Sequence, residues 1–264
     1  MSGAPCTRSE LVEGLRRAGL CAGNRVVVHS SYRSIGPVEG GPAVVVDALL
    51  EAVGGEGLLV VPTFTYDSAR FDPLHDPGRS GVVSETARTR PDAVRSLHPA
   101  YSVAAIGRGA EELCRGHEQR AGTDVGTPLD RLAAAGGHVL LVGVGETSNT
   151  TVHVGEFHAG VRYLEIPFSP DWPAVHEIAA PGGEAIRVEY TRFPGCSRAF
   201  GALEWRLRRR GAVRDGRLGA ALVQLIDGAA IVEETVAELR HDPAALLCTD
   251  AACYRCSRAR RLLG

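Results

Sequence analysis

The sequence predicts a single α/β domain over residues 1–264, with a mixed central sheet flanked by helices and an antiparallel extension. Three observations support this fold class. The first sixty residues alternate between helical and strand patterns, in the order helix, strand, helix, strand. Short apolar runs at 25–29, 57–61 and 138–142 have the length and composition of buried strands. Between 161 and 191 the apolar spacing changes to a period of two, which indicates antiparallel strands.

Residues that are typical of helix starts and ends mark the boundaries of further elements. Thr7 and Glu10 have the spacing of a capping box at the start of the first helix. Pro42 suits the first turn of the second helix, and Gly54 and Gly55 end it. No Ser/Gly linker divides the chain, so one domain is expected. The further elements expected are strands at 101–106 and 221–226 and helices at 128–135, 150–157, 197–210 and 229–240.

The composition limits the classes of function. The net charge is −2 and all 29 cationic side chains are Arg, so neither a nucleic-acid partner nor Schiff-base or P-loop lysine chemistry is expected. The longest apolar runs are strand-sized and none marks a signal peptide, so no membrane partner is expected. The seven scattered cysteines predict reduced thiols, and therefore a cytoplasmic protein.

The first candidate site is the segment HSSYRSIG, residues 29–36, which directly follows a predicted buried strand. Ligands of α/β sheets bind at strand ends, and hydroxyl groups, backbone amides and an Arg suit a phosphate or an amide-rich ligand. The alternative is a polar turn whose side chains only cap it locally. The segment is not a G-x-G-x-x-G motif, so it does not predict a dinucleotide site.

The second candidate is the segment NTTVHVGE, residues 149–156, where His153 and Glu156 are three residues apart and share one face of a predicted helix. A neighbouring carboxylate can orient an imidazole and keep it basic, as a general base requires. The alternative is a helix-start histidine beside a solvated glutamate. The spacing is not H-E-x-x-H, which disfavours a zinc protease.

The third candidate is a long irregular loop expected over residues 63–95, because six of the fifteen residues from 63 to 77 are Asp, Pro or His. Loops of this length in a compact domain are more often functional than not. The carboxylates of Asp67, Asp72 and Asp76 would suit a cationic substrate, although Arg side chains dilute their field. Turn formation and solubility are the alternative explanation for these residues.

The fourth candidate is the spacing Cys248-x4-Cys253-x2-Cys256, with Cys196 available as a fourth thiolate. A C-x2-C pair is a spacing that zinc favours. There is no second close pair, so a structural zinc site and four free thiols both remain open. No feature of the sequence marks an activated catalytic thiol.

Taken in order, these segments resemble the aminoglycoside 3-N-acetyltransferase family. The matching pieces are VVVHSSYRSIG with VEGGP close behind, LLVVPTFTYD, RSLHPAYSVAAIG, TPLDRL, HVLLVGVG and NTTVHVGE. Their order and spacing both fit, and the resemblance extends from about residue 9 to about residue 245. It implies a single α/β domain that transfers an acetyl group from acetyl-CoA to a small-molecule primary amine.

The resemblance also implies roles for individual residues. His153 matches the proposed general base and Glu156 its acidic neighbour, and no metal is needed for this chemistry. Thr127 stands where similar members usually have Ser, and it keeps the hydroxyl. The acceptor site would include Tyr66, Asp67, Asp72 and Thr150. The implied contacts of CoA are His29, Ser30, Ser31, Arg33, Ser34, Ile35, Ser102, Val103 and Thr127.

The chemistry agrees with these roles. An alkylammonium must lose a proton before it attacks a thioester, and most of it is protonated near neutral pH. His153 could take that proton, directly or through water. Attack then builds negative charge on the thioester oxygen, which a backbone N–H or a hydroxyl such as that of Thr150 or Ser31 could stabilise.

The acceptor amine stays open. The resemblance favours the 3-amino group of a deoxystreptamine aminoglycoside, and hence antibiotic resistance. Arg70, Arg79, Arg88 and Arg90 partly cancel the loop's acidity, so a biosynthetic N-acetyltransferase acting on a phosphonate- or nucleotide-linked amine is the alternative. A non-catalytic CoA-binding protein is a third hypothesis, which would not need the histidine–glutamate pair.

Overall fold

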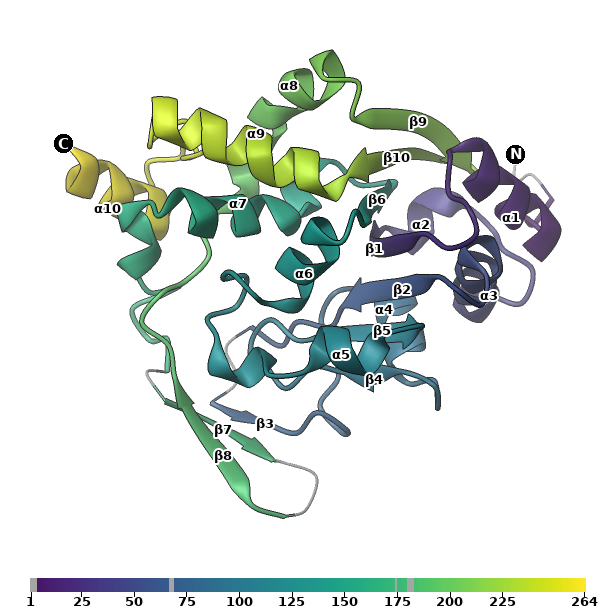
Figure 1. The fold of residues 1–264 in the computed structure, drawn as a ribbon, viewed down its shortest axis with the longest axis horizontal. Coiled ribbons are helices and arrows are strands. Elements are labelled where there is room, and N and C mark those ends of the chain that lie inside the picture. Colours follow the sequence, from purple (N-terminus) through teal and green to yellow (C-terminus); the bar gives the residue numbers. More distant parts are fainter. Residues whose placement is uncertain (1–3, 67–68, 174, 180–182) are drawn as a thin grey trace.

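The computed structural model describes residues 4–66, 69–173, 175–179 and 183–264. A seven-stranded sheet forms its centre, in the spatial order β4-β5-β2-β1-β6-β10-β9 (Figure 1). Strand β1 is parallel to both β2 and β6, whereas every other pairing in this sheet is antiparallel. The strands are β1 (Arg25–Ser30), β2 (Leu58–Pro62), β4 (Val94–Arg95), β5 (Val103–Gly107), β6 (His138–Val142), β9 (Val213–Leu218) and β10 (Ala221–Asp227).

Helices cover both faces of this sheet. Because side chains alternate along a strand, Val26 and Val28 of β1 pack into one apolar cluster and Val27 into the other. The first cluster includes α1 (Arg8–Arg17), α2 (Tyr32–Ile35), α3 (Pro42–Val53) and α4 (Val82–Arg88). The second includes α5 (Ala110–Cys114), α6 (Pro128–Ala134), α7 (Thr151–Ala159), α8 (Glu204–Arg209), α9 (Gly228–His241) and α10 (Tyr254–Leu263).

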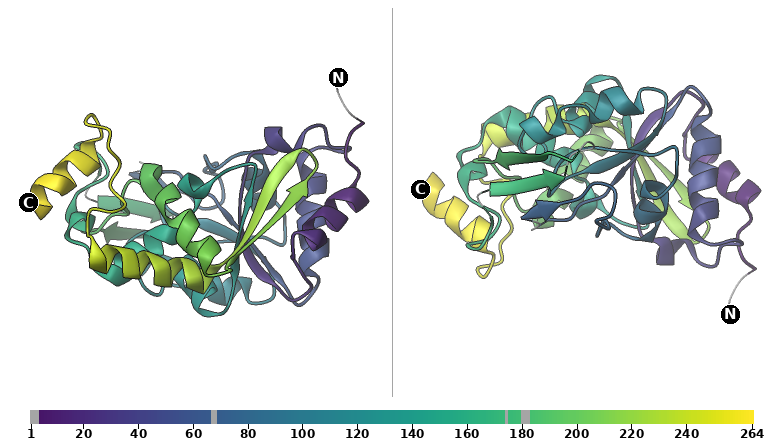
Figure 2. Two further views of the ribbon diagram at one scale, coloured as in Figure 1. Left: turned by 90° about the horizontal axis from the view of Figure 1, so that it is seen from above. Right: turned by 90° about the horizontal axis from the view of Figure 1, so that it is seen from below.

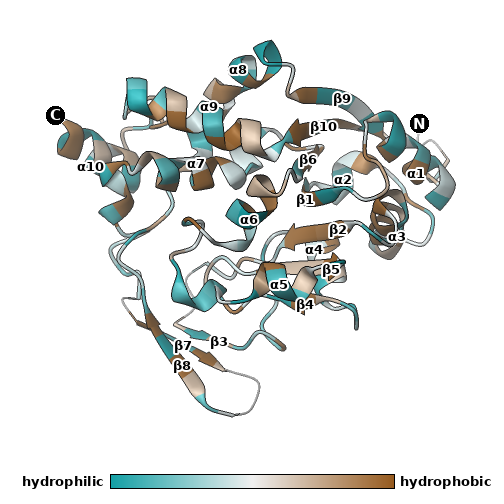
Figure 3. Cartoon of the chain, viewed as in Figure 1, coloured by the Kyte–Doolittle hydropathy of each residue, from teal (hydrophilic) through white to brown (hydrophobic). Residues whose placement is uncertain are grey.

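The helices thus form a layer on each side of the sheet. Figure 2 shows the purple N-terminal helices and the yellow-green α9 on opposite sides of the sheet. Figure 3 shows apolar residues along the central strands, with polar residues on the outer surfaces of the helices. Among the described residues, no helix combines the length and the apolar character needed to cross a membrane.

A smaller three-stranded sheet extends from the main body (Figure 1). Strands β7 (Val175–Ala179) and β8 (Ala185–Glu189) are antiparallel, and β3 (Arg70–Phe71) pairs in parallel with β7. Just beyond β8, the ring of Tyr190 stacks on His98 of the main body, with ring centroids 4.7 Å apart.

The predicted fold class, a mixed sheet flanked by helices with an antiparallel extension, is confirmed. The strand pattern expected from residue 161 is wrong at its start, where η3 (Arg162–Glu165) is a 3₁₀ helix. Tyr163 and Leu164 are adjacent and both are buried in the same cluster, which a strand with alternating faces does not allow.

Three further expectations need correction. Residues 63–95 are not wholly irregular, since they contain β3, α4 and β4. The helix expected over 197–210 is divided into a 3₁₀ segment, η4 (Ser197–Leu203), followed by α8. Strand β9 was not predicted, because its sequence VRDGRL has no apolar alternation and it lies at the sheet edge, where one side needs no partner strand.

The topology creates a place for a ligand. The chain passes from β1 to β2 through α3 on one face, and from β5 to β6 through α5 and α6 on the other. The carboxyl ends of the parallel strands β2, β1 and β6 therefore meet at one edge, beside a change in crossover direction. Such a switch point is where open α/β sheets bind ligands.

Candidate active site

A cavity of about 830 Å³ lies where β1 and β2 end and where the loop after β6 leads into α7. Polar groups from distant parts of the chain line it together with aromatic rings, as in many small-molecule sites. The lining residues discussed below are His29, Ser30, Tyr66, Asn149, Thr150, His153, Cys196, Arg198, Asp250, Cys253, Tyr254 and Arg255.

His153 and Glu156 form a pair on α7. Nδ1 of His153 lies 2.6 Å from Oε2 of Glu156, as expected for residues three apart on a helix. The side chain of Phe200 meets the imidazole edge-on, with ring centroids 4.7 Å apart. His153 is 8% exposed and lines the cavity, so its Nε2, which has no hydrogen-bond partner among the described residues, is the nitrogen left to meet a substrate.

The carboxylate of Glu156 is fixed by two more donors. The Gly195 backbone N–H donates to Oε2 over 2.9 Å and the Tyr163 hydroxyl donates to Oε1 over 2.8 Å. Burial, with the nearby Glu156 charge, raises the pKa of Tyr163 well above its usual range, so the phenol remains a donor. A Cβ at position 195 would lie 2.3 Å from Oε1, so only glycine leaves room for this carboxylate.

The start of α7 supplies neutral polar groups. Asn149 is fully buried, donates through Nδ2 to Oε2 of Glu146 over 2.8 Å, and accepts at Oδ1 from the Thr151 N–H over 3.2 Å. Burial raises the pKa of Glu146. Thr150 is 7% exposed and lines the same cavity as His153, which follows it by three residues.

The turn after β1 is attached to the loop after β6. The Ser31 N–H donates to the Val142 carbonyl over 2.9 Å, and the Ser34 hydroxyl contacts the Ser31 hydroxyl at 3.0 Å and the Gly143 carbonyl at 3.3 Å. Gly143 has φ 62° and approaches Ser34 so closely that a Cβ would lie 2.3 Å from the Ser34 Cβ. His29, at the end of β1, is buried, and burial lowers its pKa to about 4.

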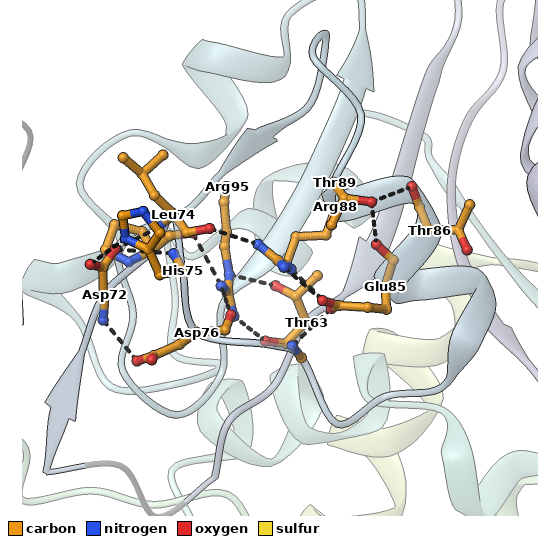
Figure 4. Close-up of polar contacts among 12 residues, drawn as sticks. Thr63, Asp72, Leu74, His75, Asp76, Glu85, Thr86, Arg88, Thr89 and Arg95 are labelled. Carbon is orange, nitrogen blue, oxygen red and sulfur yellow. Dashed lines mark hydrogen bonds and ion pairs between the residues drawn. The ribbon is translucent and has the colours of Figure 1, made fainter.

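Polar contacts order the loop after β2, as Figure 4 shows. The Arg95 guanidinium donates to the carbonyls of Pro73, Asp76 and Thr63 at 3.1, 2.5 and 2.9 Å. Half-burial lowers the pKa of Arg95 to about 10, which still leaves it charged near neutral pH. Arg95 therefore acts as a brace inside the loop.

Several other charged side chains of this loop also bind within the protein. Arg88 makes a two-pronged ion pair with Glu85 at 2.6 and 2.9 Å, and Arg90 pairs with Asp47 at 2.8 Å. Asp72 accepts from Nδ1 of His75 at 2.7 Å, and this hydrogen bond lowers the pKa of the Asp72 carboxyl. None of these six side chains lines the cavity.

The site is thus a cavity in which a buried carboxylate, that of Glu156, orients the imidazole of His153. A sequence model of the family described as aminoglycoside 3-N-acetyltransferase matches residues 27–240. The chain belongs to this family. Aminoglycoside N(3)-acetyltransferase IV from Salmonella sp is 33% identical over 239 residues, which cover 89% of this chain and 88% of that protein.

Solved structures of aminoglycoside acetyltransferases are also similar. The AAC(3)-IVa apoenzyme superposes with a TM-score of 0.83 at 32% identity, over 97% of each chain. A histidine-to-alanine mutant of AAC(3)-IVa in complex with gentamicin gives the same TM-score and identity, over 99% of each chain. The binary complex of AAC-IIIb with CoASH has a TM-score of 0.78 at 28% identity, over 90% of this chain and 97% of that one.

In this member of the aminoglycoside 3-N-acetyltransferase family, the structure brings part of the predicted site together. His29, Ser30, Tyr66, Thr150 and His153 all line the cavity. Glu156 lies directly behind His153, 1% exposed. Asp67 lies outside the described residues. The resemblance and the i, i+3 spacing thus placed the imidazole and its carboxylate where the cavity is.

Other predicted contacts lie elsewhere. Asp72, Ser31, Arg33, Ser34, Ile35, Ser102, Val103 and Thr127 do not line the cavity. Ser102 is fully buried, with its hydroxyl hydrogen-bonded to Thr63, and Val103 is a core residue of β5. The Thr127 hydroxyl donates to the Asp124 carbonyl over 2.7 Å, so it stabilises its own turn.

Several lining residues were missed by the sequence reasoning. Asn149 begins the second candidate segment, in which only Thr150, His153 and Glu156 were given roles, and its place beside Thr150 is a signal that could have found it. Three more lining residues come from the C-terminal segment, which lies beyond the residues that the family model matches. They are Asp250, Tyr254 and Arg255. No local pattern places that segment at the cavity.

Proposed function

We propose that this protein transfers the acetyl group of acetyl-CoA to the 3-amino group of a deoxystreptamine aminoglycoside. The observation that carries the proposal is His153, held by Glu156 at 2.6 Å on the wall of a cavity of about 830 Å³. The gentamicin complex of AAC(3)-IVa and the CoASH complex of AAC-IIIb support the two substrates, because both proteins resemble this chain over nine-tenths or more of its length.

His153 acts as the general base. Its Nδ1–H is bound to Glu156, so the unprotonated Nε2 removes a proton from the ammonium group of the acceptor, directly or through water. The freed amine attacks the thioester carbon, the new C–N bond forms, and the C–S bond breaks. The imidazolium then gives its proton to the leaving CoA thiolate, and the second amine proton passes to solvent, so His153 returns to its neutral form.

The negative charge that develops on the thioester oxygen during this attack needs a hydrogen-bond donor. Thr150 lines the cavity three residues before His153, and its backbone carbonyl already accepts the His153 N–H over 3.0 Å. Its hydroxyl has no hydrogen-bond partner among the described residues and can donate to a developing oxyanion. The Ser31 hydroxyl is bonded to Ser34 and is the less available donor of the two.

The turn over 30–36 binds CoA in this proposal. Ser30 opens onto the cavity, and the turn that follows is fixed to the loop after β6 through Ser31 and Ser34. Hydroxyl groups, backbone N–H groups and the exposed Arg33 suit the amides and the phosphates of CoA. Acetyl-CoA and reduced thiols are both cytoplasmic, so the protein acts in the cytoplasm.

A biosynthetic acetyltransferase acting on an anionic amine is the second candidate. The loop arginines do not support it in the way expected from sequence, since Arg88 and Arg90 are paired with Glu85 and Asp47. One other cation, Arg255, lines the cavity without a carboxylate partner among the described residues and is the observation that favours this acceptor class, whereas the lining residue Arg198 pairs with Asp250.

Release of the CoA thiol from acetyl-CoA tests the proposal, with deoxystreptamine aminoglycosides, simple diamines and amino-phosphonates as acceptors. We expect turnover with aminoglycosides, and His153→Ala should lower kcat by about 10²- to 10⁴-fold while CoA still binds. The matched control is His241→Ala, an exposed histidine at the end of α9, which should keep full activity.

Turnover confined to anionic amines would replace the aminoglycoside by the second acceptor class. CoA binding without turnover of any acceptor would instead support the non-catalytic hypothesis. An unchanged kcat in His153→Ala would remove the histidine from the mechanism.

A further inference from the structure

Four cysteines from two distant segments meet beside the cavity. Cys196 precedes η4, whereas Cys248 and Cys253 precede α10 and Cys256 lies in its first turn. Their sulfur atoms all lie within 4.8 Å of one another, and all four are free cysteines. We infer that these four thiolates bind one Zn²⁺ ion, in a closed site that holds the C-terminal segment against the acceptor cavity.

The spacing of the sulfur atoms fits a zinc ion. Four sulfurs placed about 2.3 Å from a tetrahedral zinc are separated by about 3.8 Å. The sulfurs of Cys196 and Cys248 are 3.9 Å apart, close to that edge and far beyond the roughly 2.05 Å of a disulfide. A donor set made only of thiolates selects soft metals, zinc foremost, and a closed set of four leaves no position for a substrate.

Backbone donors are already directed at these sulfurs. The Cys248 N–H donates to the Cys256 sulfur over 3.3 Å. The Arg198 backbone N–H donates to the Cys196 sulfur, and that of Asp250 to the Cys248 sulfur, each two residues beyond its cysteine. Such N–H donors stabilise and orient metal-bound thiolates, and they act before the ion arrives.

The proposed zinc would join the parts that build one wall of the cavity. Cys196 and Cys253 both line the cavity, as do Tyr254 and Arg255 beyond them. Cys196 also follows Gly195, whose N–H holds Glu156. Zinc binding at the four cysteines thus fixes this wall and the peptide that orients the catalytic pair.

The zinc ion would also change the net charge of this cavity wall, and the effect on the acceptor rests on the proposed function. Zinc and four thiolates together carry a net charge of roughly −2. Two of the nearby cations are engaged, since Arg198 pairs with Asp250 at 2.5 Å and Arg260 donates to the carbonyl of Cys248 at 2.7 Å. The loaded site would therefore attract a polycationic acceptor.

Metal content is the direct test. The full chain, purified under reducing conditions without chelator, should contain about one zinc ion per chain by elemental analysis. Cobalt(II) exchanged into the site should give the intense visible absorption of a tetrahedral thiolate complex. A chain that holds no zinc and does not take up added zinc or cobalt under reducing conditions would overturn the inference, as would a disulfide within the cluster.

Variants separate this site from the chemistry. Cys253→Ser should lower zinc occupancy and the melting temperature, and it should raise KM for the aminoglycoside more than it lowers kcat. Cys253→His offers another zinc ligand and should retain the metal. The matched control is Cys21→Ser, an exposed cysteine outside the cluster, which should leave zinc content and KM unchanged.

Failure of a variant to fold would leave the wild-type metal analysis to decide. Zinc content does not depend on turnover, so the zinc site and the proposed function fail independently of each other. Full zinc occupancy in both Cys253→Ser and a Cys196→Ser variant would overturn the assignment of the ligands.

Discussion

Replacing Glu156 by Gln tests how the catalytic pair works, because the structure allows the charge to be removed with little change in shape. The Gln oxygen can occupy the Oε2 position and accept from the Gly195 N–H and from Nδ1 of His153. The Gln NH₂ group then faces the hydroxyl of Tyr163, which can rotate to accept. The tautomer of His153 is therefore preserved and only the negative charge is lost.

The size of the effect follows from the charge separation. When His153 takes the substrate proton, its imidazolium and the Glu156 carboxylate have charge centres about 4 Å apart, worth about 4 kcal/mol at an effective dielectric constant of about 20. If half of that charge has formed in the transition state, Glu156→Gln costs about 2 kcal/mol. The expected loss in kcat is therefore about 30-fold, rising to about 10³-fold for full proton transfer.

The assay is thiol release at saturating acetyl-CoA over a range of aminoglycoside concentrations. An electrostatic role predicts a fall in kcat with KM for the aminoglycoside nearly unchanged, and the melting temperature checks that the variant is folded. Glu165→Gln, at an exposed glutamate of η3, is the matched control and should behave as the wild type. A kcat within about threefold of wild type would refute the electrostatic role of Glu156.

For two further perturbations, a lowered pH and the substitution Gly195→Ala, the structure gives the direction of the expected effect. Burial lowers the pKa of both His29 and His117 to about 4. Below pH 6.5 the unfolded chain therefore binds protons at these histidines that the folded chain does not bind. The free energy of unfolding in urea should then fall between pH 6.5 and 4, by about 2 kcal/mol per histidine at pH 5, and a flat profile would contradict it. Gly195→Ala should lower kcat by at least the factor expected for Glu156→Gln, because its Cβ would lie 2.3 Å from Oε1 of Glu156. Unchanged kinetics would show that the carboxylate can move without loss.

The sequence predicts local and periodic features well. The capping box of Thr7 and Glu10 is present, with both of its hydrogen bonds formed. The three central parallel strands, β1, β2 and β6, lie within a residue of their expected bounds, because each is a continuous apolar run buried on both faces. Burial on both faces leaves no polar alternation, and length and composition alone identify such strands.

Features that depend on distant partners were not predictable. The loop over 63–95 is ordered mainly by Arg95, whose hydrogen bonds reach backbone carbonyls 19 to 32 residues away. Ser102 looks like a ligand contact in its motif, yet its partner Thr63 stands 39 residues earlier on a neighbouring segment. A motif shows which type of residue stands at a position, whereas the exposure of that residue depends on which strand packs beside it.

The same distinction applies within the site. The contact between His153 and Glu156 is set by helix geometry, so spacing alone predicted it. The other groups that hold Glu156 come from Tyr163, seven residues on, and from Gly195, thirty-nine residues on. Cys196, next to Gly195, was available in the sequence as a fourth thiolate, but only the fold shows that it meets the other three.

The charge on the cavity wall remains the feature that links these observations to the acceptor. Among the described residues that line the cavity, Asp250 has the only carboxylate, and it is already paired with Arg198. A polycationic aminoglycoside would therefore meet neutral oxygens and the Arg255 cation, and the four-cysteine zinc site would add an attractive net charge of roughly −2. Attraction of this kind is screened by salt, because the Debye length falls from about 10 Å at 0.1 M to about 3 Å at 1 M. KM for the aminoglycoside should thus rise with ionic strength in the zinc-loaded enzyme and much less in Cys253→Ser; an equal salt dependence in both would place the attracting charge elsewhere.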